Sequence, residues 1–397
     1  MKIGFLNIPL KEDFSIKSLL SFEKTPTNML LLVITMGLLA VFAVGIVSFL
    51  LHGHHAYAVT REHPWGLLLA VYIFFVVSST GLCIIGSLGD VFGFEDYMLI
   101  SKRAIFGSIV TILAGFAVIV FEIGHPVTML IYNVLSPGLT SAIWWMGTLY
   151  GMYLTFMIVE FYFLLNGDMK KAKIFGLTGL LIGLAAHSNL GSVFGFLNAR
   201  EISQGVFYPT YFILTAFITG VYLAFILMGF RYKLDFPEKV KTMLVGLAKI
   251  QGLLLSILIF FVTWKMLTDI YGGVPHKSDV ALHILGSWTF QAEVLLAMFI
   301  PLFLILKDMG KNPVTLFWAS LSGMVGIFFM RYNLVHDTQL QPMMELKTTE
   351  YQLVPTWVEY FPSTTEMAIS LGGVGLALLM YYVGTKAFNL DEEEGGH

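Results

Sequence analysis

The sequence predicts an all-α integral membrane protein with about ten transmembrane helices, and two observations carry this prediction. First, 57% of the 397 residues are hydrophobic and only 12% are charged, whereas soluble domains carry about 25% charged residues. Second, several apolar runs exceed the ~20 residues that a helix needs to cross a bilayer. A soluble globular domain is therefore excluded. Because no basic tract interrupts the chain, we expect no nucleic acid partner.

Hydropathy divides the chain into apolar spans separated by connections. The first span follows a polar, lysine-bearing arm and is long enough to cross the membrane, so we expect no removable signal peptide. The longest later connection is a predicted loop at 336–363. The ten spans lie at about 28–51, 65–88, 103–121, 142–165, 172–190, 208–230, 244–268, 284–306, 313–335 and 364–386.

The distribution of Lys and Arg predicts the orientation of the spans. With the N-terminus in the cytoplasm, sixteen of the 23 Lys and Arg residues fall in inside segments, four fall in outside loops and three lie within spans. Cytoplasmic loops of membrane proteins carry such an excess of positive charge. We therefore expect a multi-pass protein with both termini in the cytoplasm.

This topology collects nine of the ten histidines at the outer membrane face. The ordinary polarity of loops explains one group of them equally well: His52, His54 and His55. It fits His63, His125 and His187 less well, because these three adjoin apolar helix ends that are marked by Pro or Gly.

Ionisable residues inside the spans are few, and at membrane depth they mark functional sites by default. Glu122 ends the third span, Glu160 lies in the inner part of the fourth, and Glu293 lies in the outer half of the eighth. Glu160 is equally well a satisfied carboxyl of the bundle interior or a proton-conducting group. Arg331, near the outer end of the ninth span, either anchors that end or pairs with a carboxylate such as Glu293 or Glu366.

The stretch 121–147 places several polar groups at one helix rim. After Glu122 comes a predicted loop with His125, and then Trp144 and Trp145 near the start of the fourth span. Taken alone, the two tryptophans are typical of the aromatic belt at a membrane interface. A carboxylate and an imidazole at a helix end that water can reach are suited to exchanging protons with a bound ligand.

Three classes of function compete for these features. A haem b cytochrome needs axial histidines that face one another within the helices, and no histidine lies at mid-helix. A secondary transporter has its site near the bilayer midplane, often at broken helices, and the in-span glycines leave this alternative open. A quinone site needs an apolar slot and proton-exchanging groups around the head, which an outer rim with Glu122, His125 and His63 supplies. The single cysteine, Cys83, excludes a self-contained iron–sulfur cluster.

Five segments, in the same order, resemble the NrfD/PsrC family of polysulfide reductase membrane subunits, and its longer, ten-helix members in particular. Residues 140–147 (TSAIWWMG) are similar to the family's TSPIWWG segment, and Glu122 stands where an acidic residue precedes that segment. Residues 63–66 (HPWG) resemble the PWG start of the family's first core helix. The remaining three segments are 187–192, 292–296 and 360–372.

The resemblance implies two four-helix bundles, formed by spans two to five and six to nine, with spans one and ten as additions. The expected division of the chain is a cytoplasmic arm 1–26, a first helix with its outer loop 27–64, the bundles 65–206 and 207–335, an outer loop 336–363, and a last helix with its cytoplasmic tail 364–397.

The resemblance also implies a quinone-binding membrane subunit of a respiratory oxidoreductase, in the cytoplasmic membrane of a bacterium or archaeon. Such a chain exchanges electrons between menaquinone and an extracytoplasmic iron–sulfur subunit of the four-cluster, ferredoxin-like type. A catalytic subunit or a multihaem cytochrome completes the complex, and proton translocation can accompany the transfer. The chain itself is expected to hold no haem or iron–sulfur cluster.

The quinone head is expected at the outer rim, between the second, third and fourth spans. We expect proton-exchanging, catalytic roles for Glu122, His125 and Glu160. Tyr72 and Leu69 stand where the polysulfide reductase subunit has a histidine and an asparagine near its quinone, so the hydrogen-bond donors must differ here. The expected quinone-binding residues are His63, Trp65, Tyr72, Glu122, His125, Trp144, Trp145 and His187.

Overall fold

The structure of the chain is a computed structural model. This structure describes residues 25–274, 276–342 and 357–391, together with a few positions among the first 24. Among those few, β1 (Lys2–Ile3) and β2 (Leu6–Asn7) form a short antiparallel pair. Most of the predicted N-terminal arm, and residues 343–356 of the predicted 336–363 loop, lie outside the described residues.

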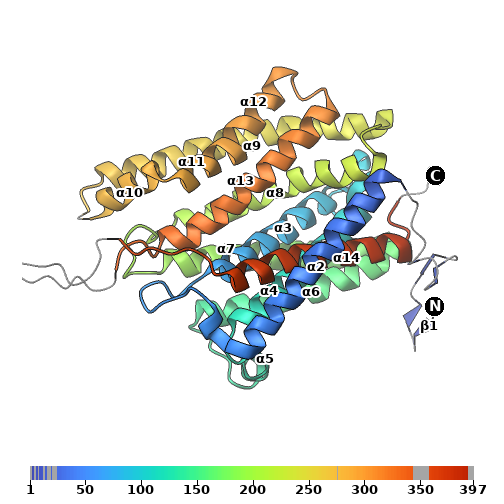
Figure 1. The fold of residues 1–397 in the computed structure, drawn as a ribbon. Coiled ribbons are helices and arrows are strands. Elements are labelled where there is room, and N and C mark those ends of the chain that lie inside the picture. Colours follow the sequence, from blue (N-terminus) through green and yellow to red (C-terminus); the bar gives the residue numbers. More distant parts are fainter. Residues whose placement is uncertain are drawn as a thin grey trace, which may run out of the picture.

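Ten helices in the described part of the chain are long and apolar enough to cross a membrane (Figure 1). This confirms the prediction of an all-α membrane protein with ten spans. Nine of the spans are α2 (Pro26–His52), α3 (Leu67–Asp90), α4 (Glu95–Glu122), α6 (Ala142–Leu165), α7 (Met169–Gly195), α8 (Phe207–Tyr232), α9 (Glu238–Tyr271), α13 (Pro313–Asp337) and α14 (Thr364–Ala387). The remaining span, the eighth in chain order, consists of three consecutive pieces: α11 (Trp288–Val294), the π-helical η2 (Leu295–Phe299) and α12 (Ile300–Lys307).

Local chemistry sets where many of these helices begin. Proline occupies the first turn of α2 and α13, where its missing N–H costs nothing. Side-chain oxygens cap other starts: Ser141 accepts from the Trp144 amide in α6, and Ser287 accepts from the Phe290 amide in α11.

The π-helical turn in this eighth span has an identifiable cause. Pro301 has no N–H to donate to the Ala297 carbonyl, and the Ile300 amide instead reaches back to the Leu295 carbonyl. The Tyr222 hydroxyl of α8 donates to the Ala297 oxygen at 2.7 Å. A neighbouring helix therefore satisfies the backbone group that the proline leaves free, as the bilayer interior requires.

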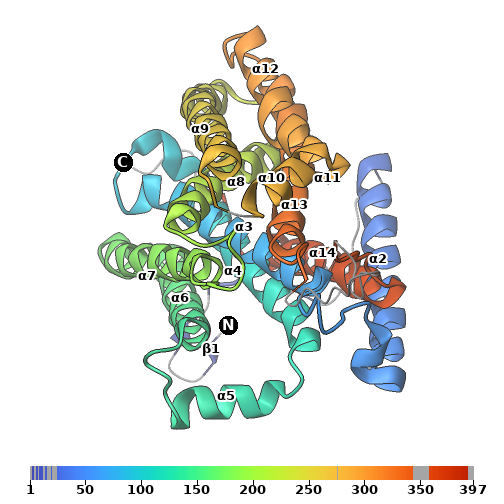
Figure 2. The same ribbon diagram turned by 90° about the vertical axis from the view of Figure 1, so that its left-hand side faces the viewer.

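Eight of the spans pack as two closed rings of four. In the first, α3 contacts α4, α4 contacts α6, α6 contacts α7, and α7 returns to α3; the second joins α8, α9, α12 and α13 in the same way. The rings meet through α3, which packs on both α8 and α13, and through α7, which also packs on α8. Seen end-on in Figure 2, α14 lies against α4, and α2 lies outside it.

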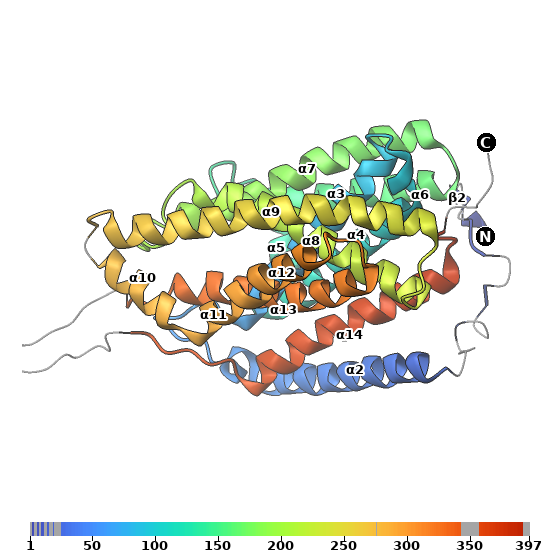
Figure 3. The same cartoon turned by 90° about the horizontal axis from the view of Figure 1, so that it is seen from above.

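The outer end of the molecule is defined here as the end where α3, α8 and α14 begin and α4, α9 and α13 finish. At the opposite, inner end, α2 begins and α14 finishes (Figure 3). There the Lys11 amide and ammonium donate to the carbonyls of Ala387 and Thr385, each at 2.9 Å. The two ends of the described chain therefore meet at one end of the bundle.

Among the described residues, three short helices add to the ten spans at the outer end. They are η1 (Gly53–Ala56), α5 (Pro126–Leu135) and α10 (Lys277–Gly286). The prediction of a plain loop after Glu122 was therefore wrong in part, because Pro126 starts a ten-residue helix within it. The eighth span also begins later than predicted, because α10 ends at Gly286 and Ser287 caps a new helix.

The contact between the two rings depends on two glycines. A Cβ added to Gly81 of α3 would overlap the backbone of α8 at Ala216 and Gly220, and a Cβ added to Gly220 would overlap the backbone of Gly81. Helix backbones can approach this closely only where small residues face one another. At these two glycines the seam is therefore a backbone-to-backbone contact with no side chain between the helices.

We predict that Gly81→Ala destabilises the protein by about 1–3 kcal/mol, because the added methyl forces α3 and α8 apart. The measurement is the midpoint of thermal unfolding in detergent. Gly151→Ala in α6 is the matched control, since a Cβ there meets nothing within 4 Å. Equal midpoints for the two variants would show that the seam is not tight.

Candidate functional site

Two histidines and a tyrosine form the centre of a polar cluster at the outer end. His63 belongs to the segment that connects α2 to α3, and its ring is fully buried. Its Nε2 lies 3.2 Å from Nδ1 of His336 in α13. The ring of Tyr360 stacks on His63 with 4.2 Å between ring centres. Nδ1 of His63 is buried and has no hydrogen-bond partner among the described residues.

The carboxylate of Glu366 holds this cluster in place. It is fully buried and accepts hydrogen bonds from the amides of Ala58 (2.9 Å), Leu67 (3.3 Å) and Ser363 (2.9 Å) and from the Tyr360 hydroxyl (2.5 Å). A carboxylate offers about four acceptor sites, so this group is fully satisfied. Its role is structural: it joins the starts of α3 and α14 to the segment before α3.

The HPWG sequence has a structural explanation at this point. A Cβ on Gly66 would overlap Oε1 of Glu366 and lie 3.0 Å from the Tyr360 hydroxyl, so only glycine fits. The amide and carbonyl of Trp65 both bond to the side chain of Gln339, each at 3.0 Å, and the Trp65 ring meets Phe194 edge-on. Trp65 therefore ties the segment before α3 to α13 and α7.

Glu122 is the last residue of α4 and is half-buried beside this cluster. Its carboxyl faces the Gly66 backbone and the Glu366 carboxylate. Oε2 is buried, and within the described ranges no group hydrogen-bonds to it. Unlike Glu366, Glu122 therefore has an acceptor atom that remains available to a ligand.

Three of the predicted rim residues lie elsewhere. His125 is exposed and precedes α5, with no side-chain cap bond. The indole of Trp144 donates to the Asn133 carbonyl at 2.8 Å, and that of Trp145 donates to the Leu139 carbonyl at 2.9 Å. The two tryptophans therefore fasten the α5 segment to α6. Their contacts fit the interfacial anchoring that their sequence pattern also allowed.

A second group of predicted residues lies deeper in the first ring. His187 of α7 is fully buried, and its Nδ1 is 2.9 Å from the Tyr150 hydroxyl and 3.4 Å from the Thr80 hydroxyl. Tyr72 is buried beside Tyr150, with 6.4 Å between ring centres. Nε2 of His187 is buried without a hydrogen-bond partner in the part of the chain that the structure describes.

Arg331 continues this polar region into the second ring. It is fully buried, donates to the Thr215 hydroxyl and lies over the Phe212 ring at 4.9 Å. Its Nε and Nη1 have no partner among residues 25–274, 276–342 and 357–391. Glu293 is near Arg331 and accepts from the Asn333 amide at 2.7 Å. Of the two carboxylates weighed as partners for Arg331, Glu293 is the one at its side.

Glu160 lies near the inner end of the first ring, beside a second carboxyl. Its carboxyl group is fully buried and faces Asp90, the last residue of α3. None of the four carboxyl oxygens has a hydrogen-bond partner among the described residues. Gly176 leaves room for Glu160, because a Cβ there would overlap Oε1. Two adjacent carboxyls without a cation are best accommodated by a shared proton.

Sequence reasoning missed several residues of these groups. His336 was counted among the outer histidines, and Tyr360 and Glu366 lie in or beside one of the family-like segments, but nothing linked them to His63. Asp90 and Tyr150 were not singled out from the sequence at all. These residues meet partners that are 37 to about 300 positions away in the sequence, and such pairing leaves no periodic signal.

Metal binding finds no support in the described residues, where no group of three or more His, Cys, Asp or Glu side chains is arranged to hold an ion. The arrangement instead offers buried hydrogen-bonding atoms at the outer rim and along the bundle interior.

Comparisons with known proteins place this geometry in context. The family model described as polysulphide reductase, NrfD, matches residues 55–343. The Hdr-like menaquinol oxidoreductase integral membrane subunit of Archaeoglobus fulgidus is 26% identical over 374 residues, which cover 90% of this chain and 92% of that protein. A selenate reductase subunit of Mesobacillus selenatarsenatis is 23% identical over 389 residues, covering 86% and 90% respectively. The similarity therefore runs along most of the chain.

We predict that the folded state loses stability as the pH falls from about 6.5 toward 4. Burial, together with the His336 ring and the Arg200 guanidinium, lowers the pKa of His63 to about 3. Between that pKa and the ordinary ~6.5 the unfolded chain binds a proton that the folded chain excludes, so stability falls by up to about 1.4 kcal/mol per pH unit. Thermal unfolding in detergent across this range measures the slope.

The matched variants are His63→Gln and His55→Gln, since His55 is exposed. His63→Gln should flatten the slope, and His55→Gln should leave it unchanged. A slope that survives His63→Gln in full would assign the effect to other groups.

Proposed function

The chain belongs to the NrfD polysulphide reductase family, which confirms the resemblance drawn from its motifs, and from this premise we propose that it is the quinone-binding membrane subunit of a respiratory oxidoreductase. In this role it exchanges electrons between the menaquinone pool and partner subunits. Two relatives support the proposal by name: one is a subunit of a menaquinol oxidoreductase and the other a subunit of selenate reductase.

One observation supports a location for the quinone head within this fold. At the outer rim, Oε2 of Glu122 and Nδ1 of His63 are buried without a hydrogen-bond partner in the described residues. Buried polar atoms are normally paired, so an unpaired one calls for an explanation such as a ligand. These atoms fit the carbonyl and hydroxyl groups of a quinone head, with Trp65 and the aromatic rings of the rim as apolar surroundings.

A bound quinone supplies two-electron chemistry that is coupled to the uptake or release of two protons. In our proposal, Glu122 holds or releases one of these protons at Oε2, where the carboxyl is close to the outer surface. His63 donates or accepts a hydrogen bond through Nδ1, while its other nitrogen is held by His336. Glu366 positions both through Tyr360 and the start of α3.

The partners follow from the same proposal. An extracytoplasmic iron–sulfur subunit of the four-cluster, ferredoxin-like type would dock on the outer end, beside the rim. A catalytic subunit or a multihaem cytochrome would complete the complex, with both termini of this chain in the cytoplasm. Co-purification of such subunits distinguishes this function from a transporter that works alone.

Polar groups in the interior support a proton route from the inner end. On the outer side of the Asp90–Glu160 pair, the Tyr153 hydroxyl bonds to the hydroxyls of Ser108 (2.7 Å) and Ser79 (3.1 Å). The next polar group toward the outer end contains Tyr150 and His187, followed by Arg331. We propose that Glu160 and Asp90 share a proton and pass it toward the outer site through these groups, with water filling the gaps.

We predict that Glu122→Gln lowers quinone-dependent turnover about a hundredfold, because the amide keeps the shape of the side chain but cannot exchange a proton. The variant should still assemble with its partners, and electron transfer from those partners to an artificial dye should continue. Turnover with a soluble menaquinone analogue, in the purified complex, is the measurement.

Two control variants separate this role from a structural one. Glu359→Gln, at an exposed position of the outer surface, should behave as wild type. Glu366→Gln should lower the unfolding midpoint, because the amide cannot accept all four hydrogen bonds. Near wild-type turnover in Glu122→Gln would remove Glu122 from proton exchange and leave His187 as the next candidate.

We also predict that Glu160→Gln slows quinone-dependent turnover and proton movement in liposomes about tenfold, because the carboxyl pair can no longer release a shared proton. The folded protein should be retained, since the amide can still bond to Asp90. The control is Glu238→Gln, which removes a well-exposed carboxyl at the inner end of α9. Unchanged proton movement in Glu160→Gln would exclude the carboxyl pair from the route.

A further inference from the structure

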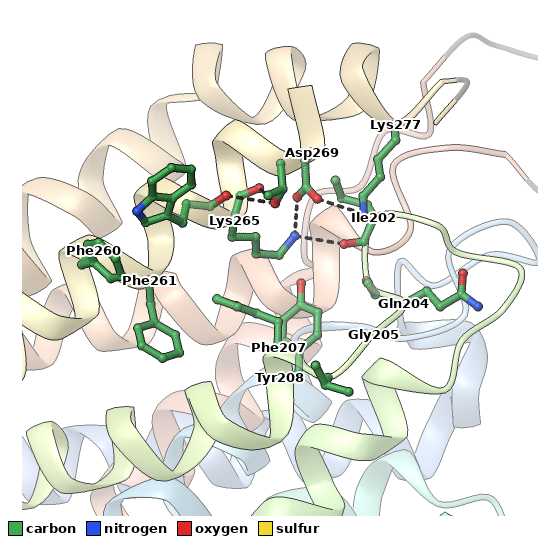
Figure 4. A pocket seen from close by; sticks show the side chains of 14 residues that line it. Ile202, Gln204, Gly205, Phe207, Tyr208, Phe260, Phe261, Lys265, Asp269 and Lys277 are labelled. Atoms are coloured by element: carbon green, nitrogen blue, oxygen red, sulfur yellow. Dashed lines mark hydrogen bonds and ion pairs between the residues drawn. The ribbon is translucent and has the colours of Figure 1, made fainter. Parts of the chain in front are cut away.

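A hollow of about 360 Å³ lies at the outer end of the second ring, between α8, α9 and the segment before α8. One wall is apolar and comes from α9: Phe260, Phe261 and Trp264 (Figure 4). Phe260 and Trp264 are more than half exposed (61% and 53%) on a span. The hollow therefore opens sideways, toward the apolar part of the bilayer.

The back of this hollow is charged. The Lys265 ammonium bonds to the Asp269 carboxylate at 2.5 Å and to the Ile202 carbonyl at 3.0 Å, and Lys277 bonds to the other oxygen of Asp269 at 2.9 Å (Figure 4). Lys265 also lies over the rings of Phe207 and Tyr208. Two ammonium groups, an aromatic hydroxyl and one carboxylate thus face an apolar mouth.

A smaller hollow of about 60 Å³ continues inward and shares Phe207, Tyr208 and Lys265 with the first. Its far side is formed by Glu293, Asn333 and Asp337. Asn333 donates to Glu293 at 2.7 Å, while its own Oδ1 is buried and lacks a partner among the residues that are described. The two hollows therefore share the wall formed by Phe207, Tyr208 and Lys265, and the smaller one is lined by two further carboxyls.

These features decide which ligand fits. An apolar mouth facing lipid and a polar back suit an amphiphile that enters from the bilayer. A phosphate head would lie against the Asp269 carboxylate, which already bonds to both lysines of the hollow, and like charges at this depth repel one another. A neutral head with carbonyl oxygens gains hydrogen bonds from Lys265 and Tyr208 without that repulsion.

We propose that this hollow is a second quinone-binding site, separate from the rim at Glu122. The inference rests on the proposed function, because that function supplies the quinone. Lys265 and Tyr208 hold the carbonyl oxygens of the head, Phe260 and Trp264 hold the isoprenoid tail, and Asp269 keeps Lys265 in position. The two sites lie on either side of the outer end of α13, where His336 faces the rim and Asn333 faces the hollow.

The test is photolabelling of the purified complex with an azido-menaquinone analogue that carries an isoprenoid tail, followed by peptide mapping. We expect labelled peptides from residues 202–208 and 260–269, in addition to label at the rim. Excess menaquinone should compete with the label at both places, and vesicles of anionic phospholipid should compete at neither.

Two variants make the assignment specific. Val206→Trp places a large ring at the mouth, at a position that is 88% exposed, and should abolish label in the hollow while leaving label at the rim. Lys265→Gln should weaken binding in the hollow about tenfold, the equivalent of ~1.4 kcal/mol and of one hydrogen bond to a charged group. Val127→Trp, on exposed α5, is the control and should change neither.

The failures are distinguishable. Label at the rim alone, or label in the hollow that only anionic phospholipid displaces, would overturn the second site and leave the proposed function intact. A complex that neither binds the analogue anywhere nor turns over with quinone would overturn both.

Discussion

One buried carboxylate, that of Glu366, organises the outer end of the molecule. It caps the first turn of α14, accepts the first amide of α3, and binds both the Ala58 amide and the Tyr360 hydroxyl. The Leu67 amide also donates to the Tyr360 hydroxyl, at 2.7 Å, but the other donors would be unsatisfied close to lipid, where water cannot replace the lost bond. The arrangement requires glycine at position 66 and holds His63 and Tyr360 in a stack. The structure of the rim therefore depends on the four hydrogen bonds that Glu366 accepts.

The requirement that buried polar groups have hydrogen-bond partners also makes the unpaired polar atoms informative. In a bilayer, a buried polar atom without a partner costs more than in a soluble protein. Some of them follow a line from Asp90 and Glu160 at the inner end, through His187 and Arg331 in the middle, to His63 and Glu122 at the rim. Others, such as Gln251 of α9 and Asp308 after α12, lie elsewhere in the second ring. Such a line is what a chain retains when water or a ligand completes its bonds.

Hydropathy alone was enough to predict the ten spans, because each apolar run is long and is ended by charged residues or by Gly and Pro. The short helix α5 could not be found this way, since its ten residues lie among prolines and serines that are typical of a loop. Single site residues such as Glu122 and His63 stood out as polar groups at helix ends. Their partners did not, because the approach of His336 to His63, or of Asp90 to Glu160, depends on how the helices pack.

The glycine seam between α3 and α8 bears on how the protein can move. A carrier that works by alternating access needs one half of the molecule to rock against the other around a central site. Here one of the contacts between the two halves joins backbone atoms at Gly81 and Gly220, and at this point no side chain lies between them that could change rotamer and absorb a rotation. Rocking would have to separate this contact. The seam therefore favours a rigid scaffold. Such a scaffold is suited to conducting protons rather than to transporting solutes whose passage requires the two halves to separate.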